Sequence, residues 1–334
     1  MELLKKLFAI HSKSGKEGKM KRFIWNWVKQ NVPGCRIEED KTGNIYITKT
    51  KTSKSRKDEE TTYPCIVAHL DQVQEKHSKD FICLESEDII IGYSPKRREQ
   101  QGLGADDKCG IWIALNCLKQ YDNLKVAFFV GEEIGCKGSS KANIEFFSDC
   151  RFVLEPDRRG NSDLITEIGW TPLCSDEFLN DIDFKRFGYK EENGMMTDIE
   201  ALKENSLAIS CINLSCGYYK PHTDQEFVVK ADLLNCQAFV KHIIDTCTKV
   251  YPHVEQDYRY DRYSYYGDYY DLYDEMYELI SVHPEMSFGD IEAAYKESYP
   301  GINRTELENA YDLAREDVYF WQEDEKRAAS RKLK

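Results

Sequence analysis

Eight histidine and acidic residues, far apart along the chain, have the types and spacing of a two-metal hydrolytic site. They are His69, Asp71, Asp106, Asp107, Glu132, Glu133, Asp157 and His222. Imidazole and carboxylate groups bind zinc, and in two-metal sites the ions lie roughly 3.5–4 Å apart, close enough for one carboxylate to bridge them. A further acid, free of metal, must transfer protons. Because the chain supplies carboxylates for both tasks, we expect it to hold two zinc ions.

Neighbouring residues within this set suit different tasks. Adjacent side chains point in different directions, so one member of Glu132-Glu133 can bind metal while the other remains a free base. A histidine that binds zinc usually has its second ring N–H held by a carboxylate, and Asp71 follows His69 by two residues. We expect a zinc-bound water, its pKa lowered toward ~7, to attack a carbonyl. The free glutamate would take the proton of this water and later protonate the leaving amine.

The segments that carry these residues alternate between strand and helix patterns. Runs of β-type residues predict strands at 45–48, 63–70, 89–93, 125–130, 151–154 and 207–214. Apolar residues at helical spacing predict helices at 20–32, 106–118, 140–147 and 231–250. This alternation predicts an α/β fold with a mixed central sheet flanked by helices, in which ligands bind at the carboxyl ends of strands.

The candidate ligands lie where such a sheet would place a site. Each of four strands ends at or before one of them: 63–70 at His69 and Asp71, 125–130 before Glu132-Glu133, 151–154 before Asp157, and 207–214 before His222. Asp106 instead opens a helix, whose N-terminal dipole favours a carboxylate there. We therefore expect the four strand ends to converge on one rim.

The composition of the chain changes abruptly after the helix at 231–250. Nine tyrosines occur between Tyr258 and Tyr277, interleaved with Asp, Arg and Gly, as either a binding surface or a linker that packs on its own domain. Further on, Ser287–Asp290 and Thr305–Glu308 resemble helix capping boxes. We predict a catalytic domain at 1–254, a Tyr/Asp-rich linker at 255–271 and a small helical C-terminal module at 272–334.

Bulk composition excludes several classes of protein. A length of 334 residues with 41% hydrophobic residues suffices for a large core, and a net charge of −13 argues against nucleic acid or an anionic membrane as the main partner. The lysine-rich run Lys49–Lys57 is typical of a solvated hairpin loop. The twelve cysteines are scattered and several lie in apolar segments, so we expect buried thiols. With neither a signal peptide nor a membrane-spanning stretch, the expected location is cytoplasmic.

Five short motifs resemble those of the co-catalytic zinc exopeptidases, in particular peptidase T and related dipeptidases, aminopeptidases and aminoacylases. In the family's order they are Ala68-His69-Leu70-Asp71, Leu103-Gly104-Ala105-Asp106-Asp107-Lys108-Cys109-Gly110, Gly131-Glu132-Glu133-Ile134-Gly135, Glu155-Pro156-Asp157 and Lys220-Pro221-His222-Thr223. The resemblance covers about residues 1 to 250. It implies the zinc exopeptidase fold, with its phosphorylase/hydrolase-like sheet.

The resemblance also implies a role for each residue. It assigns His69 and Asp157 to one zinc ion, Glu133 and His222 to the other, Asp106 to both as a bridge, Glu132 to the general base and Asp71 to the orientation of His69. Relatives with aspartate at the position of Asp157 tend to be aminopeptidases or dipeptidases, whereas glutamate there tends to accompany carboxypeptidases and aminoacylases. The aspartate in this chain thus implies an aminopeptidase.

One departure from the family pattern concerns the interval between Asp157 and His222. Many relatives carry a lid or dimerisation domain there, but in this chain the two residues are only 65 positions apart, which predicts that the lid is missing. The interval includes Met196-Thr197-Asp198, which resembles a family signature. A lid histidine that stabilises the oxyanion in relatives has no counterpart. Tyr218 or Tyr219 could replace it, or the second zinc ion could act alone.

The favoured function is cleavage of short peptides from a free N-terminus, as in an aminopeptidase or tripeptidase. Two alternatives stay open: an amidohydrolase that deacylates N-acyl amino acids, and a non-catalytic peptide-binding or scaffolding protein, against which the intact Glu132 argues. Arg158-Arg159 could bind a substrate carboxylate, although a solvated turn is the preferred interpretation. Cobalt or manganese suits the same ligands. Peptide length, side-chain preference and oligomeric state are left open.

Overall fold

The computed structural model describes residues 1–51, 61–169 and 171–254, with selected positions between 276 and 315. The chain divides into two compact units, Met1–Glu255 and Gln256–Lys334, and each is described by itself. Three sequence interpretations lie wholly or mostly outside the described residues. They concern the lysine-rich run Lys49–Lys57, the tyrosine-rich stretch and the second capping box at Thr305–Glu308.

A nine-stranded mixed sheet runs through the described part of the first unit. Its order is β1-β2-β7-β3-β8-β12-β9-β10, with β11 paired to β9. The strands are β1 (Arg36–Glu39), β2 (Ile45–Lys49), β3 (Tyr63–His69), β7 (Leu124–Phe129), β8 (Cys150–Arg158), β9 (Asp163–Ile168), β10 (Thr171–Pro172), β11 (Lys190–Gly194) and β12 (Cys211–Ser215). The adjacent strands β7, β3, β8 and β12 are mutually parallel. Their carboxyl ends therefore meet at one edge of the sheet.

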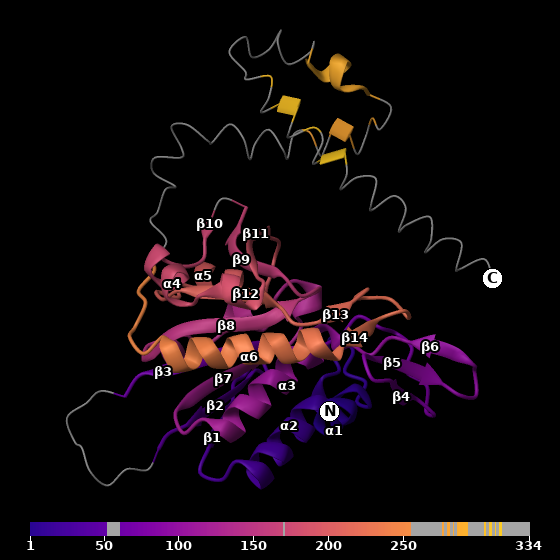
Figure 1. Cartoon of the computed structure of the whole chain (residues 1–334). Helices are drawn as coiled ribbons and strands as arrows, with labels where there is room; N and C mark the ends of the chain where they lie inside the picture. Colours follow the sequence, from indigo (N-terminus) through magenta and orange to yellow (C-terminus); the bar gives the residue numbers. More distant parts are fainter. Residues whose placement is uncertain are drawn as a thin grey trace. The chain divides into compact units, whose positions relative to one another are not determined.

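Both faces of this sheet are covered, which explains why its central strands are apolar throughout. Alternate residues of β3 point to opposite faces: Ile66 and Ala68 join one core cluster, and Cys65 and Val67 join the other. The first cluster packs against α1 (Glu2–Phe8), α2 (Gly18–Asn31), α3 (Ala105–Gln120), α4 (Asp176–Asp181) and α6 (Lys230–Thr246). The second packs against α5 (Asp198–Glu204) and η3 (Ile144–Phe147). Figure 1 shows α3 and α6 lying across the sheet.

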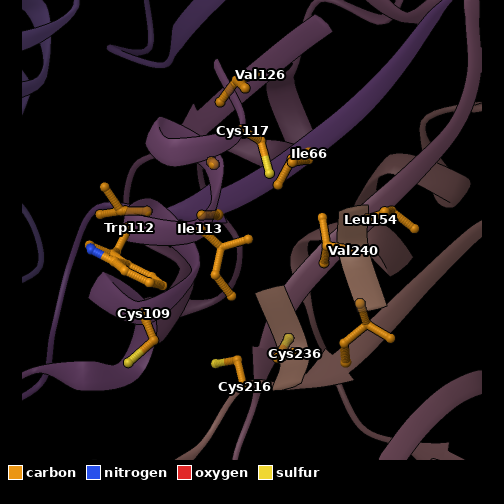
Figure 2. Packing of buried hydrophobic residues seen from close by; sticks show 14 of the residues in the cluster. Ile66, Cys109, Trp112, Ile113, Cys117, Val126, Leu154, Cys216, Cys236 and Val240 are labelled. Atoms are coloured by element: carbon orange, nitrogen blue, oxygen red, sulfur yellow. The ribbon is translucent and has the colours of Figure 1, made fainter. Parts of the chain in front are cut away.

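The interior of the first cluster joins helices to the sheet directly. Figure 2 shows Ile113 and Cys117 of α3 near Ile66 of β3, and Val240 of α6 near Leu154 of β8. All five side chains are fully buried. This contact fixes α3, and hence its N-terminus, against the strands that carry the candidate ligands.

A smaller sheet lies beside the start of α6 (Figure 1). Within the described residues it has five strands in the order β13-β14-β5-β4, with β6 paired to β5. The strands are β4 (Ile82–Glu85), β5 (Ile89–Ser94), β6 (Glu99–Gln101), β13 (Tyr218–Tyr219) and β14 (Phe227–Val229). The segment between β13 and β14 contains His222, so this sheet anchors both ends of the loop that carries the last candidate ligand.

The mixed α/β sheet flanked by helices is confirmed, and three of its elements differ from expectation. The segment expected as a helix at 140–147 forms two 3-10 turns, η2 (Ser139–Lys141) and η3, because extended backbone at Ala142 and Asn143 separates them. Strand β8 continues past the expected 151–154, because its pairing with β12 extends to Arg158. The strand expected at 207–214 begins only at Cys211. Asp157 therefore lies within a strand rather than after one.

The described residues of the second unit form a small helical core. Its buried members are Met276, Ile280, Ile291, Leu307, Tyr311 and Ala314. The capping box expected at Ser287–Asp290 is present: the Ser287 hydroxyl accepts the backbone N–H of Asp290 at 3.3 Å, and the Asp290 carboxylate accepts that of Ser287 at 3.0 Å. The expected helical character of the C-terminal module is thus confirmed for these residues.

Two further expectations concern thiols and membrane helices. None of the twelve cysteines forms a disulfide, and ten of them are buried, as expected. In the described part of the chain, the longest apolar helices fall short of what is needed to cross a membrane.

Candidate metal centre

The candidate ligands come from three strand ends, a helix start and a loop. His69 is the last residue of β3, and Asp157 lies near the end of β8. Glu133 lies in η1 (Glu132–Ile134), the 3-10 turn that follows β7. Asp106 stands at the start of α3, where its backbone is not yet helical (φ −75°, ψ 102°), and the Asp106-Asp107 peptide bond is cis. His222 lies in the loop after β13 with a positive φ of 62°.

Two ligand sets face each other across the carboxylate of Asp106. On one side, Nε2 of His69 lies 2.9 Å from Asp106 Oδ1 and 3.5 Å from Asp157 Oδ1. On the other side, Nε2 of His222 lies 3.2 Å from Asp106 Oδ2 and 3.0 Å from Glu133 Oε2. The two oxygens of Asp106 therefore serve different histidines. All five residues expected to bind metal are brought together.

The donor set fits divalent cations. Ligand atoms of His69, Asp106 and Glu133 all lie within 4.8 Å of one another. Among the described residues, the buried oxygen Glu133 Oε1 has no hydrogen-bond partner, and Asp157 Oδ1 has only the 3.5 Å approach of His69. A buried carboxylate oxygen without a partner is costly, and a cation held there would remove that cost. Nitrogen and oxygen donors of this kind suit zinc, with cobalt and manganese as chemical alternatives.

The electrostatic balance of the cluster favours positive charge. Hydrogen bonds that His222 donates to Asp106 and Glu133 raise the pKa of His222 to about 10. Burial alone would lower the pKa of His69, but the facing carboxylates, first Asp157, hold it well above its usual value. Burial raises the pKa of Asp157 well above normal, and the nearby charge of Asp107 adds to this. Carboxylates in excess of histidines create a field that a divalent cation would neutralise.

Glu132 is set apart from the ligand sets. Its half-buried carboxylate has, within the described residues, a single hydrogen bond, a weak one from the Cys136 thiol at 4.0 Å. Burial raises the pKa of Glu132 to about 8; His69 opposes this rise and the charge of Asp198 supports it. The backbone of Glu132 is fixed, because its N–H donates to Asp71 Oδ1 at 3.0 Å. Its side chain thus remains available beside the two ligand sets.

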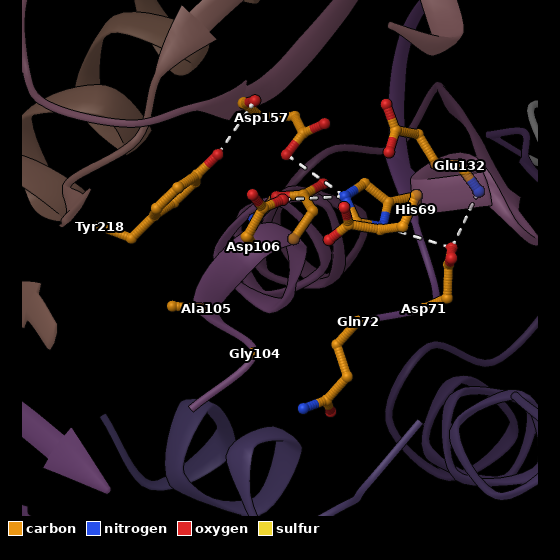
Figure 3. A network of polar contacts seen from close by, with 12 residues as sticks. His69, Asp71, Gln72, Gly104, Ala105, Asp106, Glu132, Asp157 and Tyr218 are labelled. Carbon is orange, nitrogen blue, oxygen red and sulfur yellow. Dashed lines mark hydrogen bonds and ion pairs between the residues drawn. The ribbon is translucent and has the colours of Figure 1, made fainter. Parts of the chain in front are cut away.

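Asp71 contacts both the His69 ring and the turn that carries Glu132. Its Oδ1 lies 3.5 Å from His69 Nδ1, the ring nitrogen that faces away from Asp106, and its Oδ2 accepts the Ser14 hydroxyl at 2.7 Å. The same carboxylate accepts the N–H of Glu132, as Figure 3 shows. Asp71 is therefore placed to orient both the His69 ring and the turn that carries Glu132.

The remaining sequence candidates divide into near and distant residues. Tyr218 is buried, and its hydroxyl donates to the Asp157 carbonyl at 3.3 Å, on the edge of the cluster (Figure 3). Tyr219 points elsewhere, since its hydroxyl donates to Asp232 at 2.6 Å. Arg158 pairs with Asp163 at 3.3 Å. The Asp107 carboxylate accepts the N–H of Gly110 at 2.8 Å within α3. Tyr218 and Asp107 therefore border the cluster, whereas Tyr219 and Arg158 pair with residues elsewhere.

Several buried polar residues around the cluster received no role from the sequence, although two of them, Glu155 and Asp198, lie in motifs that resemble the family's. Glu155 accepts the Thr197 hydroxyl, and Asp198 accepts the Ser139 hydroxyl at 2.5 Å, which explains the place of Met196-Thr197-Asp198 beside the site. Glu226 binds backbone N–H groups at the start of α3. No local spacing rule marks these residues, because each acts on a segment far away in the sequence.

The interval between Asp157 and His222 belongs to the first unit throughout. It contains β9, β10, β11 and β12, all of which join the large sheet, together with α4 and α5. Its residues therefore build the sheet that supports the site.

Comparison with known proteins identifies the fold. Neither a scan against protein-family profiles nor a search of curated protein sequences finds a match. Solved structures do match. An aminopeptidase PepT from Bacillus cereus has a TM-score of 0.57 and 13% identity, over 73% of this chain and 96% of that one. A tripeptidase from Staphylococcus aureus has a TM-score of 0.55 and 15% identity, over 72% and 95%.

An archaeal protein extends this similarity. An aminopeptidase from Desulfurococcus kamchatkensis has a TM-score of 0.56 and 17% identity, over 74% of this chain and 94% of its own. Similar tertiary structure at such low identity establishes a shared architecture. The chain therefore has the fold of solved aminopeptidases and of a tripeptidase.

Proposed function

We propose that this protein is a metal-dependent exopeptidase that cleaves short peptides from a free N-terminus. The observation that carries the proposal is the arrangement of two ligand sets around one shared carboxylate. His69 and Asp157 would hold one cation, Glu133 and His222 the other, and Asp106 would contact both. Zinc is the preferred metal, and cobalt or manganese remains a chemical alternative.

The chemistry follows from the groups that surround this centre. When bound, a pair of divalent cations lowers the pKa of a water molecule and polarises a peptide carbonyl. Glu132, unligated and beside both sets, would accept the proton of the attacking water and pass it to the leaving amine. Asp71 would hold the His69 ring with Nε2 toward Asp106. The hydroxyl of Tyr218, which lies beside Asp157, is our candidate for contacting the oxyanion.

Two further observations support the choice of substrate. The solved structures that share this fold carry the names aminopeptidase and tripeptidase. An aspartate occupies position 157, which in the family that the motifs resemble tends to accompany aminopeptidases and dipeptidases.

The cysteines, none of which forms a disulfide, support a reducing compartment, and we propose the cytoplasm.

A substrate panel with metal analysis tests the proposal. The full-length protein is assayed with a tripeptide that has a free N-terminus, with the same tripeptide N-acetylated, and with an N-acyl amino acid. We expect two divalent ions per chain, release of the first residue from the free tripeptide, loss of this activity on chelation and its return with zinc. Preferential hydrolysis of the acylated compounds would identify a deacylase instead. Peptide binding without turnover by the metal-loaded protein would identify a non-catalytic binder.

A further inference from the structure

Glu226 is fully buried, and its carboxylate accepts hydrogen bonds from the backbone at the start of α3. Its Oε2 accepts the backbone N–H of Gly104 at 2.6 Å, and its Oε1 accepts those of Ala105 at 3.0 Å and Asp106 at 3.3 Å. The group therefore binds three consecutive backbone N–H groups, the last of which belongs to Asp106. Such charge-assisted bonds are among the stronger hydrogen bonds in proteins.

The same residue belongs to the loop that carries His222. Glu226 follows His222 by four positions and directly precedes β14. His222 itself has a side chain that is 51% exposed, so packing around its ring contributes little to its position. Glu226 thus joins this loop to the turn that presents Asp106. The two ligands it connects, His222 and Asp106, face each other at 3.2 Å.

A buried polar chain extends this connection to a third part of the site. Gln74 donates to Glu226 Oε2 at 3.2 Å, and Gln72 donates to Gln74 at 3.0 Å. Lys108, fully buried in α3, donates to Gln72 at 2.5 Å and to the Leu103 carbonyl at 2.9 Å. Gln72 directly follows Asp71. The chain therefore ties three loops of the site through buried side chains.

We propose that Glu226 is a positioning residue that sets the distance between Asp106 and His222 and so determines the affinity for the second cation. The proposal rests on the proposed function, because it requires that these residues bind metal. A carboxylate held by three N–H groups leaves the adjacent turn little freedom, and changes in groups that support metal ligands typically cost 10–100-fold in metal affinity or activity. Glu226 touches neither metal nor substrate, and it acts through the backbone of Asp106.

A matched pair of variants separates this role from a general contribution to folding. Glu226→Gln keeps the side-chain volume but replaces one acceptor oxygen by an amide that cannot accept. Asp40 offers the control, because its Oδ1 also accepts three backbone N–H groups, those of Thr42 at 2.9 Å, Gly43 at 2.8 Å and Asn44 at 3.0 Å, in a turn without a candidate ligand. Asp40→Asn makes the same carboxylate-to-amide change elsewhere in the same unit.

Zinc titration by calorimetry and the visible spectrum of the cobalt-loaded protein provide the readouts. In full-length E226Q we expect the Kd of the second cation, the one held by Glu133 and His222, to rise 10–100-fold. The cation held by His69 and Asp157 should stay bound. The remaining cobalt spectrum should match that of His222→Ala. In D40N both affinities and the spectrum should equal those of the wild type. If E226Q fails to fold, Glu226→Asp is the second variant, because it keeps the charge but has a shorter side chain. It should raise the Kd of the same cation by a smaller factor.

The outcomes distinguish this inference from the proposed function. A wild-type protein that binds two ions, together with E226Q or E226D that binds both with unchanged affinity, would overturn the positioning role and leave the proposed function intact. Equal losses of metal affinity in E226Q and D40N would show that Glu226 has only a structural role. A wild-type protein that binds no divalent ion would overturn both.

Discussion

At the scale of single residues, the site depends on Asp106, whose two carboxylate oxygens face different histidines. Oδ1 faces His69 at 2.9 Å and Oδ2 faces His222 at 3.2 Å. The backbone of Asp106 is restrained, because its N–H donates to Glu226. The geometry of the centre therefore depends as much on buried supporting groups as on the ligands themselves.

Glu132 supplies the most direct test at this scale. Because it lies beside the ligand sets without joining them, Glu132→Gln should lower kcat by about 10²–10⁴-fold and leave metal content unchanged. Steady-state kinetics and elemental analysis measure the two effects. The exposed Glu145 provides the control, since E145Q should match the wild type. A metal-loaded E132Q with wild-type turnover would exclude Glu132 as the base.

Most candidate ligands could be located from the sequence, because each lies in a short motif next to a strand or helix; that they bind metal remains a proposal. His69, Glu133 and Asp157 follow apolar runs that form β3, β7 and β8. Glu226, Glu155 and Asp198 could not be predicted this way, because their partners lie 42 to 122 positions away in sequence. Their importance comes from burial and contact, which only the folded chain reveals.

At the scale of elements, the site exists because α3 packs closely against β8. Gly110 makes this approach possible: a Cβ at this position would lie 2.7 Å from the Pro156 carbonyl oxygen and against the Asp107 carboxylate. Pro156 directly precedes Asp157, and Asp107 directly follows Asp106. The absence of a side chain at Gly110 therefore lets α3 and β8 bring their candidate ligands, Asp106 and Asp157, close together.

Gly110→Ala should separate these elements. The added methyl group must displace α3 or β8, so we expect a loss of stability of about 1–3 kcal/mol and weaker metal binding. Gly18→Ala is the control, because a Cβ there meets nothing within 4 Å at the start of α2, and it should stabilise by about 0.4–1 kcal/mol. Chemical denaturation and zinc titration measure both. Unchanged unfolding and metal affinity in G110A would contradict the account.

The elements that departed from expectation did so for tertiary reasons. Segment 140–147 has apolar residues at helical spacing, but Lys125 Nζ donates to the Phe146 carbonyl at 2.6 Å and Asn143 is extended, so two short turns form instead. Strand β8 is longer than its apolar run because β12 pairs with it up to Arg158. Pairing partners cannot be seen in a single segment, whereas the alternation of strands and helices can.

At the scale of the whole molecule, the described centre lies entirely in the first unit. The five candidate metal ligands, together with Asp71, Glu132 and Tyr218, fall within Met1–Glu255. We propose that residues 1–254 form the catalytic domain, that 255–271 are a linker and that 272–334 are a small helical module. A protein ending at Val254 should therefore keep zinc binding and turnover of a free tripeptide within about a factor of two. Aggregation or loss of activity in this truncated protein would show that the C-terminal residues complete the enzyme.

The pH dependence of stability offers a separate test. Burial, and after it the nearby charge of Lys203, which donates to the Nδ1 of His253 at 2.8 Å, lower the pKa of His253 to about 4. In the unfolded chain the pKa is about 6.5. Between these values the unfolded state binds the extra proton, so stability present above pH 6.5 is lost as pH falls toward 4. His253→Gln should reduce the slope of unfolding free energy between pH 7 and 5, measured by urea denaturation, and an unchanged slope would contradict this assignment.

The shared role of Asp106 is the central claim, and anomalous X-ray diffraction from zinc-loaded crystals tests it most directly. We predict two anomalous peaks roughly 3.5–4 Å apart, one beside His69 and Asp157 and one beside Glu133 and His222, with Asp106 between them. A single peak, or peaks that leave Asp106 without a metal contact, would contradict the account.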